Sequence, residues 1–495
     1  MPIRNTSGLR VVLVNCGQAA GKVIAGKRMM SLTTIKAGLH ARGFEDVHLL
    51  PEQEGLNFGL PVDLARLQTE LHSICRDADQ VVIGFSTTSE DMAWFLKASS
   101  MVKKEFPDVK RVVGGPGVVR EEPLYLTSGR RILDPVEQIL GRGFADAAVW
   151  GDAAPFVELI CDHAGDISAV HSPGFYCLDG SEKVVGTGRG RYPSVEAIPY
   201  LVEGDRVSII TSSGCPNSCG YCSINKGSFG FSQAMIVSAL REIYTKIGGR
   251  ANALLKIDDS NPFAFSGQNS LQAAFNHLTA SGIEDQYNIP KSAFFDPTLF
   301  IGPGSIQLFL KLIKLGVVGY YFGFETTSVK VAAKIGVKAK RNGIQVDLPL
   351  SQEDIRNTAA AILGLGRILR DNFDPIYGKP VYRIKISLMA TPFDNRETLL
   401  RACDLIGLFD SLSGGVLTVI PTITPLFPFP GTWVRRQYLD LIREPDSLTA
   451  LGDISQGMWK PEIGDGIFKV LNSLSEHARE DLSVEWFRGV IEGAF

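Results

Sequence analysis

Three cysteines lie within eight residues of one another in this 495-residue chain. Cys215, Cys219 and Cys222 have the spacing C-x3-C-x2-C, and they are three of the eight cysteines in the sequence. Disulfides among three thiols would leave one over, whereas three thiolates can ligate one metal centre together. A four-iron cluster held by three ligands would keep one iron without a protein ligand. Such an iron can hold a small chelating molecule and pass it an electron.

A zinc site is the main alternative chemistry for these thiols. Zinc ribbons and fingers use pairs of ligands that are well separated along the chain. No second cysteine pair and no H-x3-5-H pattern follows the loop. We therefore interpret the loop as an iron–sulfur site, with a zinc site completed by a distant histidine, or a chance spacing, as the alternatives.

The cysteine loop resembles the signature of the radical S-adenosylmethionine (SAM) superfamily, including the aromatic Tyr221 directly before the last cysteine. The resemblance implies a [4Fe-4S] cluster on Cys215, Cys219 and Cys222. It implies that the open iron binds the amino and carboxylate groups of SAM, with Tyr221 at the SAM site. Reductive cleavage of SAM would then give methionine and a 5'-deoxyadenosyl radical.

Strands that alternate with helices must position this loop. A strand at 207–211 runs into the cysteines, and polar residues follow several later strands, among them Asp258, Asp259, Asp296 and Glu325. In a barrel of parallel strands these ends gather at one mouth. The sequence therefore predicts an open, partial (β/α)6 TIM barrel over residues 204–432 and a helical extension over 433–495. The further strands are expected at 253–257, 292–295, 317–324, 382–388 and 416–420.

The radical SAM resemblance covers this whole barrel. Asp258 and Asp259 match a second strand that ends in carboxylates, and Gly323-Phe324-Glu325 matches the Gly-Φ-Glu of the fourth strand. The resemblance implies that Asp258, Asp259 and Glu325 hold the amino-acid and ribose parts of SAM. The alternatives are a salt-bridged glutamate at a helix start and, for the aspartates, a strand position that faces away from the site.

Two later stretches bear differently on this resemblance. After the fifth strand, only Glu397-Thr398 remains of the Pro-Gly-Glu-Thr found in many relatives, so the resemblance gives no support for adenine contacts there. After the sixth strand, 428–432 reads Pro-Phe-Pro-Gly-Thr and matches a motif of the cobalamin-containing branch. The resemblance places this motif on the substrate side of the cavity; a plain Pro/Gly loop is the alternative.

The first 165 residues show a second α/β pattern. Strands expected at 9–15, 47–50, 80–85, 111–113 and 147–150 alternate with helices, which predicts a doubly wound parallel sheet of the Rossmann-like kind. Ligands of such sheets lie beyond the carboxyl ends of the strands. Small residues gather at these ends: Gly17, Ser86, Thr87, Gly114, Gly115 and Pro116.

With Trp150-Gly151-Asp152, this pattern resembles the N-terminal cobalamin-binding domain of one large branch of radical SAM proteins, which includes the class B methyltransferases. The resemblance implies that the small residues named above let the corrin and its nucleotide tail approach the backbone. A Rossmann-like domain that has lost cobalamin is the alternative. His48 partly matches the motif of a lower axial ligand but lies inside an expected strand, so we interpret it as structural.

The remaining features constrain partners and surroundings. Residues 166–203 are expected to form a hairpin and a linker. The net charge of -3 and the absence of a long basic run make nucleic acid an unlikely partner. No apolar run is long enough for a membrane span, and the N-terminus lacks a signal-peptide pattern. Scattered cysteines favour a reducing cytoplasm.

The sequence and its resemblance together predict a cobalamin-dependent radical SAM enzyme. The expected reaction is transfer of a methyl group from methylcobalamin to an unactivated carbon, or to phosphorus, after the 5'-deoxyadenosyl radical has taken a hydrogen atom. A small molecule or a peptide is the expected substrate, and a flavodoxin or ferredoxin the expected electron donor. The alternatives are cyclisation or ring rearrangement, a methylthiotransferase acting on tRNA or protein, and a non-enzymatic cobalamin or SAM sensor.

Overall fold

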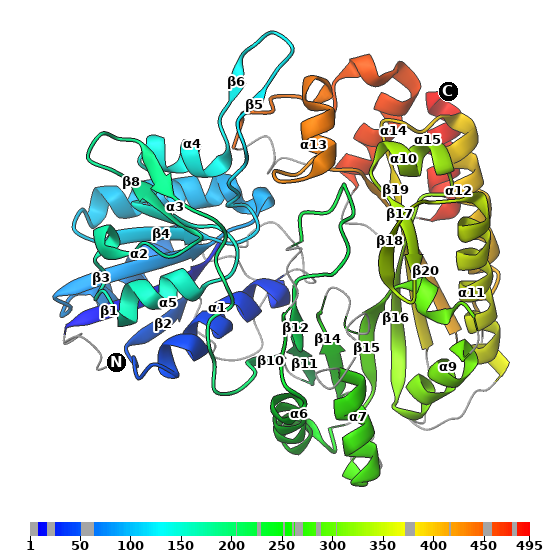
Figure 1. Ribbon diagram of the computed structural model, residues 1–495, viewed down its shortest axis with the longest axis horizontal. Coiled ribbons are helices and arrows are strands. Elements are labelled where there is room, and N and C mark those ends of the chain that lie inside the picture. Colours follow the sequence, from blue (N-terminus) through cyan, green and yellow to red (C-terminus); the bar gives the residue numbers. More distant parts are fainter. Residues whose placement is uncertain are drawn as a thin grey trace. The chain divides into compact units, whose positions relative to one another are not determined.

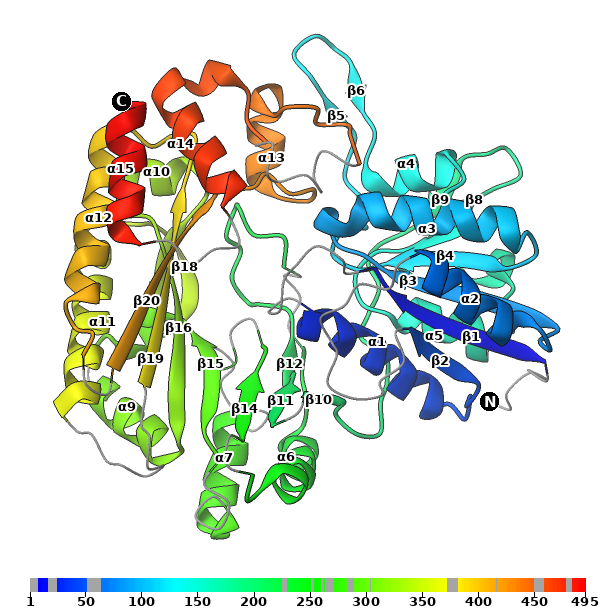
Figure 2. The same ribbon diagram turned by 180° about the vertical axis from the view of Figure 1, so that it is seen from behind.

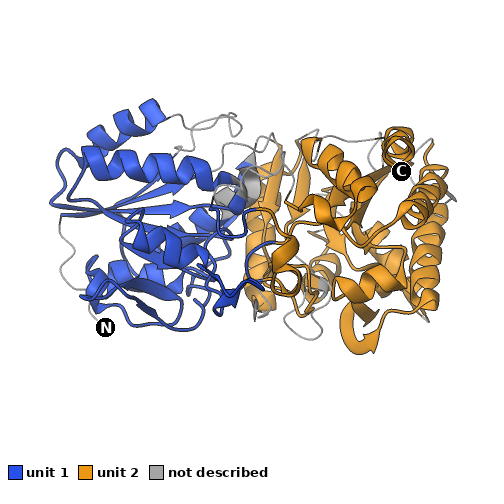
Figure 3. Ribbon diagram, turned by 90° about the horizontal axis from the view of Figure 1, so that it is seen from above, with its two compact units in different colours: residues 1–204, 429–431, 444–453 blue, residues 205–428, 432–443, 454–495 orange. Residues whose placement is uncertain are grey.

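The chain forms two compact units in a computed structural model (Figure 3). Unit 1 comprises residues 1–204, 429–431 and 444–453, and unit 2 comprises 205–428, 432–443 and 454–495. The predicted domain limits remain a prediction. The structure describes residues 8–16, 25–50, 64–203, 205–224, 229–250, 253–259, 262, 271–283, 289–302, 304–371, 382–414, 417–448, 458–477 and 483–495.

Unit 1 is built on a seven-stranded sheet of order β2-β1-β3-β4-β7-β8-β9. The first five strands in this order are parallel, and β8 and β9 add an antiparallel hairpin. The strands are β1 (Leu9–Asn15), β2 (Val47–Leu50), β3 (Gln80–Ser86), β4 (Lys110–Gly114), β7 (Ala147–Val149), β8 (Phe175–Leu178) and β9 (Val184–Gly186). The order reverses between β1 and β3, and such switch points are where doubly wound sheets bind ligands.

Helices cover both faces of this sheet (Figure 1). Phe85 and other inward side chains of β1, β3 and β4 form one buried core with Leu67 of α2, Phe95 of α3 and Ile139 of α4. On the opposite face, Gly84 lies against Phe156 of α5, and α5 contacts α1. The helices are α1 (Ala25–His40), α2 (Leu64–Cys75), α3 (Met92–Glu105), α4 (Pro135–Gly141) and α5 (Ala154–Cys161), and the small hairpin is β5 (Leu124–Tyr125) with β6 (Arg131–Ile132).

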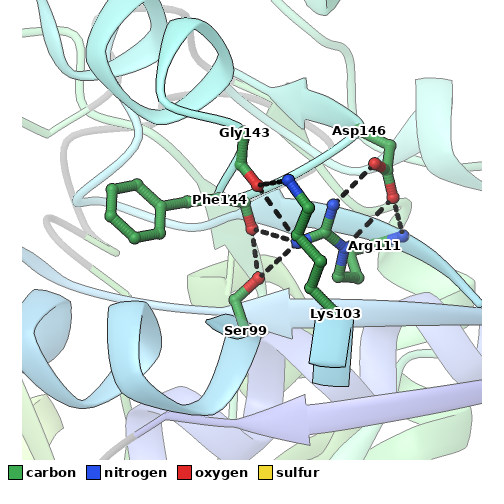
Figure 4. A network of polar contacts seen from close by, with 6 residues as sticks. All are labelled: Ser99, Lys103, Arg111, Gly143, Phe144 and Asp146. Carbon is green, nitrogen blue, oxygen red and sulfur yellow. Dashed lines mark hydrogen bonds and ion pairs between the residues drawn. The ribbon is translucent and has the colours of Figure 1, made fainter. Parts of the chain in front are cut away.

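An ion pair of a buried arginine with a half-buried aspartate links elements of unit 1 at the amino end of β4 (Figure 4). The Arg111 side chain is 5% exposed, and its guanidinium lies 2.7 Å from the Asp146 carboxylate. It also donates to the carbonyls of Gly143 and Phe144, at 3.2 and 3.3 Å. These contacts fix the turn before β7 at the end of the sheet that lies away from the predicted ligand residues.

Unit 2 contains a curved sheet of six parallel strands in the order β11-β14-β15-β16-β19-β20. Each of the six predicted barrel strands is present, and the described strands do not close into a barrel, so the predicted fold class is confirmed. The strands are β11 (Arg206–Ile209), β14 (Leu254–Ile257), β15 (Lys291–Phe295), β16 (Val317–Glu325), β19 (Tyr382–Ala390) and β20 (Leu417–Pro425), while β10 (Tyr200–Glu203) ends the first part of unit 1.

Helices line the outer side of this sheet (Figure 1). They are α6 (Gln233–Ile247), α7 (Leu271–Ala280), α9 (Ser305–Lys314), α10 (Val329–Lys334), α11 (Gln352–Asp371) and α12 (Arg396–Asp410). Two hairpins interrupt the pattern: β12 (Ser212–Ser213) with β13 (Phe229–Gly230), and β17 (Lys338–Arg341) with β18 (Ile344–Pro349).

The tail is helical, as predicted. It contains α13 (Trp433–Gln437), α14 (Asp465–Glu476) and α15 (Val484–Ala494). Helix α14 contacts β20, and α15 packs against α12 and α14 (Figure 2). This packing covers the last strand of the open sheet, whose edge would otherwise be free to pair. Among the helices that the structure describes, none has both the length and the apolar character of a membrane span.

Candidate functional site

The cysteine loop follows the carboxyl end of β11. Asp259, which is 1% exposed, anchors the start of the loop. Its carboxylate accepts hydrogen bonds from the Thr211 backbone N–H, the Thr211 hydroxyl and the Ser212 hydroxyl, each at 2.6 Å. Burial raises the pKa of Asp259 to about 6, although these hydrogen bonds oppose the shift. Asp259 therefore positions the loop in this structure.

The three loop cysteines are free thiols that interact electrostatically with one another. Cys219 is buried, at 7% exposure, and Cys215 and Cys222 are half-buried. Burial is the main cause that raises the pKa of each thiol, to about 11 for Cys222. Without a metal the loop therefore holds protonated thiols, and metal binding would release their protons.

Tyr221 and Glu325 come together beside these thiols. The Tyr221 side chain lies close enough to the Glu325 carboxylate and to the thiol of Cys219 to interact with both. Burial, and next the charge of Glu325, raise the pKa of Tyr221 well above its ordinary value. The pKa of Glu325 is also raised, because its burial outweighs the nearby ammonium of Lys340 and the hydrogen bond from Tyr221. The structure thus brings two of the predicted SAM residues next to the predicted cluster ligands.

A cavity of about 310 Å³, lined by both polar and apolar residues, opens beside Glu325. Its wall comes from the carboxyl ends of β15 and β16, from strand β17 and from the start of α11. Asp296 and Lys340 face each other in this wall at 2.7 Å, and both side chains are largely buried. Ligand pockets of proteins typically begin at about this volume.

The other predicted SAM residue, Asp258, lies on the opposite side of its strand from Asp259, as alternation requires. Its buried carboxylate pairs with the Lys256 ammonium at 3.0 Å. The roles of Asp258 and Asp259 toward SAM remain predictions. Glu397 and Thr398 serve helix α12: Thr398 takes part in its capping box and Glu397 pairs with Arg401.

Sequence reasoning missed the β17–β18 hairpin and its Lys340. Its turn is Asn342-Gly343, with φ angles of 51° and 79°. This dipeptide between two strands is the strongest short-range hairpin signal, so the sequence did contain it. The pairing of Lys340 with Asp296 has no such local signal, because the two residues are far apart in the sequence.

In unit 1 the predicted cobalamin residues meet at the ends of β3 and β4. The Thr87 N–H donates to the Gly114 carbonyl at 2.9 Å, and the Gly117 N–H donates to the Thr87 carbonyl at 3.1 Å. Gly115 has a φ of 103°, and a Cβ there would lie 2.4 Å from the Thr87 carbonyl oxygen. The close packing of these two loops therefore accounts for Gly115 without any ligand.

The other residues considered for cobalamin differ in their exposure and location. Ser86 is buried, at 8% exposure, whereas Pro116 is exposed and Gly114 and Gly115 are partly exposed at this edge. Gly17 lies outside the described residues. His48 lies within β2, opposite Val12, and its Nε2 is 2.9 Å from Asp46. This is the structural position that the sequence predicts for it.

The donor set of the cysteine loop, three free thiols, fits a four-iron cluster. Among the described residues, no group of three or more His, Cys, Asp or Glu side chains could hold a metal ion. A four-iron cluster binds each thiolate through a different iron, so it does not require the sulfurs to converge on one point. Three free thiols on one loop, with a cavity close by, meet its requirements.

Comparison with known proteins agrees with this geometry. No protein-family model and no curated protein matches the sequence. Solved structures match at low identity. The cobalamin-dependent SAM radical enzyme OxsB, with aqua-cobalamin bound, aligns with a TM-score of 0.61 and 13% identity over 95% of this chain and 66% of OxsB. The OxsB structure with both aqua-cobalamin and SAM bound aligns with a TM-score of 0.55 and 12% identity over 87% of this chain and 55% of OxsB.

The radical SAM methyltransferase TsrM from Kitasatospora setae, with cobalamin and a [4Fe-4S] cluster bound, gives a TM-score of 0.54 and 15% identity over 98% of both chains. This chain shares the fold of these two enzymes. It spans about two thirds or less of the length of OxsB and nearly the whole of TsrM. At these identities the likeness concerns the fold, and the chemistry must be argued from the side chains.

Proposed function

We propose that the chain is a cobalamin-dependent radical SAM enzyme that transfers a methyl group to an unactivated carbon or to phosphorus. The observation that carries the proposal is the proximity of Tyr221 to both Cys219 and Glu325 beside the three free thiols of the cysteine loop. It joins the predicted cluster loop to the predicted SAM residue at the mouth of the six-stranded sheet. Enzymes of this fold place their chemistry at the carboxyl ends of such strands.

Each cofactor has candidate residues in this chain. Cys215, Cys219 and Cys222 would hold a [4Fe-4S] cluster, which together with SAM supplies a radical that removes a substrate hydrogen atom. Cobalamin, which supplies the methyl group, would lie at the strand ends of unit 1 near Thr87 and Pro116. The OxsB structure contains aqua-cobalamin and SAM, and the TsrM structure contains cobalamin and a [4Fe-4S] cluster. Here they are part of the proposal.

In this proposal, the residues around the cavity bind SAM and orient the cysteine loop. Glu325 is an acceptor for the ribose hydroxyls or the ammonium of SAM, since a carboxylate forms strong hydrogen bonds with both. Tyr221 holds the Glu325 carboxylate toward the cysteine loop, and Asp259 fixes the strand end from which the loop starts. A flavodoxin or ferredoxin would supply the electrons, and a small molecule or a peptide would be the substrate.

The test uses the whole chain, reconstituted anaerobically with iron, sulfide and cobalamin, with no substrate. Reduction in the presence of SAM is expected to form 5'-deoxyadenosine and, separately, S-adenosylhomocysteine in an amount equal to the bound corrinoid. The second product reports methylation of the corrinoid. If 5'-deoxyadenosine forms without S-adenosylhomocysteine, the chain is a cyclase or a ring-rearranging enzyme. If neither forms, it is not a radical SAM enzyme.

A further inference from the structure

The β17–β18 hairpin is bound directly to the cysteine loop. The Asn217 side chain donates to the Gly343 carbonyl at 3.1 Å and accepts from the Gln345 N–H at 2.7 Å. The Ser218 N–H donates to the Gln345 side chain at 2.8 Å. These bonds hold the turn and the second strand of the hairpin against the residues between the first two cysteines.

The loop and the helix before the hairpin also approach each other closely. The Gly220 N–H donates to the Gly336 carbonyl at 3.0 Å. A Cβ on Gly220 would lie 2.8 Å from the Ile335 carbonyl oxygen, so only glycine fits there. The hairpin and the turn that leads into it are thus bonded to the loop on the two sides of Cys219.

This attachment delivers a buried ammonium to the cysteine loop. The Lys340 side chain is 14% exposed, and its Nζ pairs with Asp296 at 2.7 Å. Burial alone would lower the pKa of Lys340, but the charges of Asp296, Cys219 and Glu325 outweigh it and raise the pKa above its ordinary value. Lys340 in turn lowers the pKa of Cys215 and Cys219. It therefore remains charged next to the loop.

Asp296 opposes this charge at the cysteine loop: its carboxylate raises the pKa of Cys215, whereas Lys340 lowers it. Its other oxygen accepts hydrogen bonds from the Thr298 N–H and hydroxyl, at 3.0 and 2.6 Å, so the carboxylate is held in place. Burial keeps salt and water from screening the pair, and charges in such surroundings interact more strongly than at the surface. A cluster on three thiolates would become more negative on reduction, and a fixed cation nearby would stabilise that reduced state.

We propose that the buried ammonium of Lys340, which the β17–β18 hairpin brings to the cysteine loop, raises the reduction potential of the cluster on that loop. Lys340 is thus a positioning residue for the charge of the cluster. The inference rests on the proposed function, because it requires a redox-active cluster on Cys215, Cys219 and Cys222. The redox step itself is the gain of one electron by the cluster and the loss of one by an external protein donor of the flavodoxin type.

The test measures the midpoint potential of the reconstituted chain by redox titration followed with electron paramagnetic resonance, without SAM or substrate. Lys340→Met is expected to shift the potential to a more negative value, and Lys340→Arg to keep it near the wild-type value. Asp296→Asn removes the compensating negative charge and is expected to shift the potential the opposite way. Lys338→Met is the matched control, since Lys338 is exposed on the same strand and pairs with Asp347.

Opposite shifts in the Lys340→Met and Asp296→Asn variants, with Lys338→Met unchanged, support the inference. Equal potentials in wild type and Lys340→Met, or a shift of the same sign in both variants, overturn it. If Lys340→Met does not assemble a cluster, the Asp296→Asn shift decides alone. A wild-type chain that assembles no cluster refutes the proposed function instead, so the two failures are distinguishable.

Discussion

Glu325 has a backbone conformation that few residues other than glycine adopt. Its φ is 70°, and the pairing of β16 with β19 is irregular between Gly323 and Glu325. A Cβ on Gly323 would lie 2.5 Å from the Glu325 carboxylate, so glycine two positions earlier leaves room for that carboxylate. Such strain costs on the order of 1–3 kcal/mol and persists where the surroundings require it. The Gly-Phe-Glu sequence therefore has a physical reason at this strand end.

Replacement of this carboxylate tests its predicted role. Glu325→Gln keeps the shape of the side chain but removes its charge. Because hydrogen bonds to charged groups contribute about 1.5–3 kcal/mol, SAM is expected to bind roughly ten- to a hundredfold more weakly. Equilibrium dialysis of the reconstituted chain with labelled SAM measures this. Glu397→Gln, at an exposed ion pair, is the control; an unchanged affinity in Glu325→Gln would remove Glu325 from the SAM site.

Asp259 gives the chain a defined dependence on pH. Its pKa is raised from 3.8 to about 6 by burial. The stabilisation linked to this shift is fully present below the unfolded pKa and is lost as the pH rises through about 6. We expect the wild type to lose about 1 kcal/mol of unfolding free energy through this group between about pH 5 and pH 7, and Asp259→Asn to lose none of that part. Denaturant unfolding of both proteins at about pH 5 and about pH 7 measures this. An equal change of unfolding free energy with pH in the two proteins would show that the assignment is wrong.

At the scale of elements, two pairs of loops hold the candidate sites. In unit 1 the loops after β3 and β4 pack backbone to backbone through Thr87 and Gly115. In unit 2 the cysteine loop is bound to the β17–β18 hairpin through Asn217 and Gln345. Each pair brings together residues from different strand ends, which is how parallel sheets build sites.

Gly115→Ala tests the packing of the first pair. Both Gly115 and Gly129 have positive φ angles, of 103° and 82°, but a Cβ on Gly129 would meet no atom within 4 Å. The cost of Gly129→Ala is therefore only the strain of a positive φ at alanine, whereas Gly115→Ala must also displace Thr87. We expect Gly115→Ala to be more destabilising by about 1–3 kcal/mol and to retain less corrinoid. Calorimetry and corrinoid absorption measure this, and equal stabilities of the two variants would contradict the packing argument.

Across the whole molecule, the sequence was most informative where local patterns act alone. Apolar runs predicted all six strands of unit 2, three of which are followed by Asp or Glu, and strands that alternate with helices predicted the sheet of unit 1. The approach of Tyr221 to Glu325 is consistent with their places at the carboxyl ends of β11 and β16 in one parallel sheet, although β14 and β15 lie between these two strands. The resemblance to radical SAM proteins supplied the expected ligands.

Contacts between distant parts of the chain were not predictable in this way. Nothing local to Asp259 indicates that its carboxylate accepts from Thr211 and Ser212. The ion pair of Lys340 with Asp296 likewise arises only when the hairpin folds back onto the strand ends. These partners are set by the tertiary structure. The residues that adjust the charge and geometry of the site can therefore be identified only from such contacts.

The most direct test of the account is the iron content and paramagnetic spectrum of the anaerobically reconstituted chain. We expect the wild type to bind about four iron ions and to give the signal of a reduced [4Fe-4S] cluster. Cys215→Ala, Cys219→Ala and Cys222→Ala should each lose this signal. Cys403→Ala, which changes a buried cysteine of α12, should keep it. A wild type that binds a single zinc ion, or a full signal in any of the three loop variants, would contradict the account.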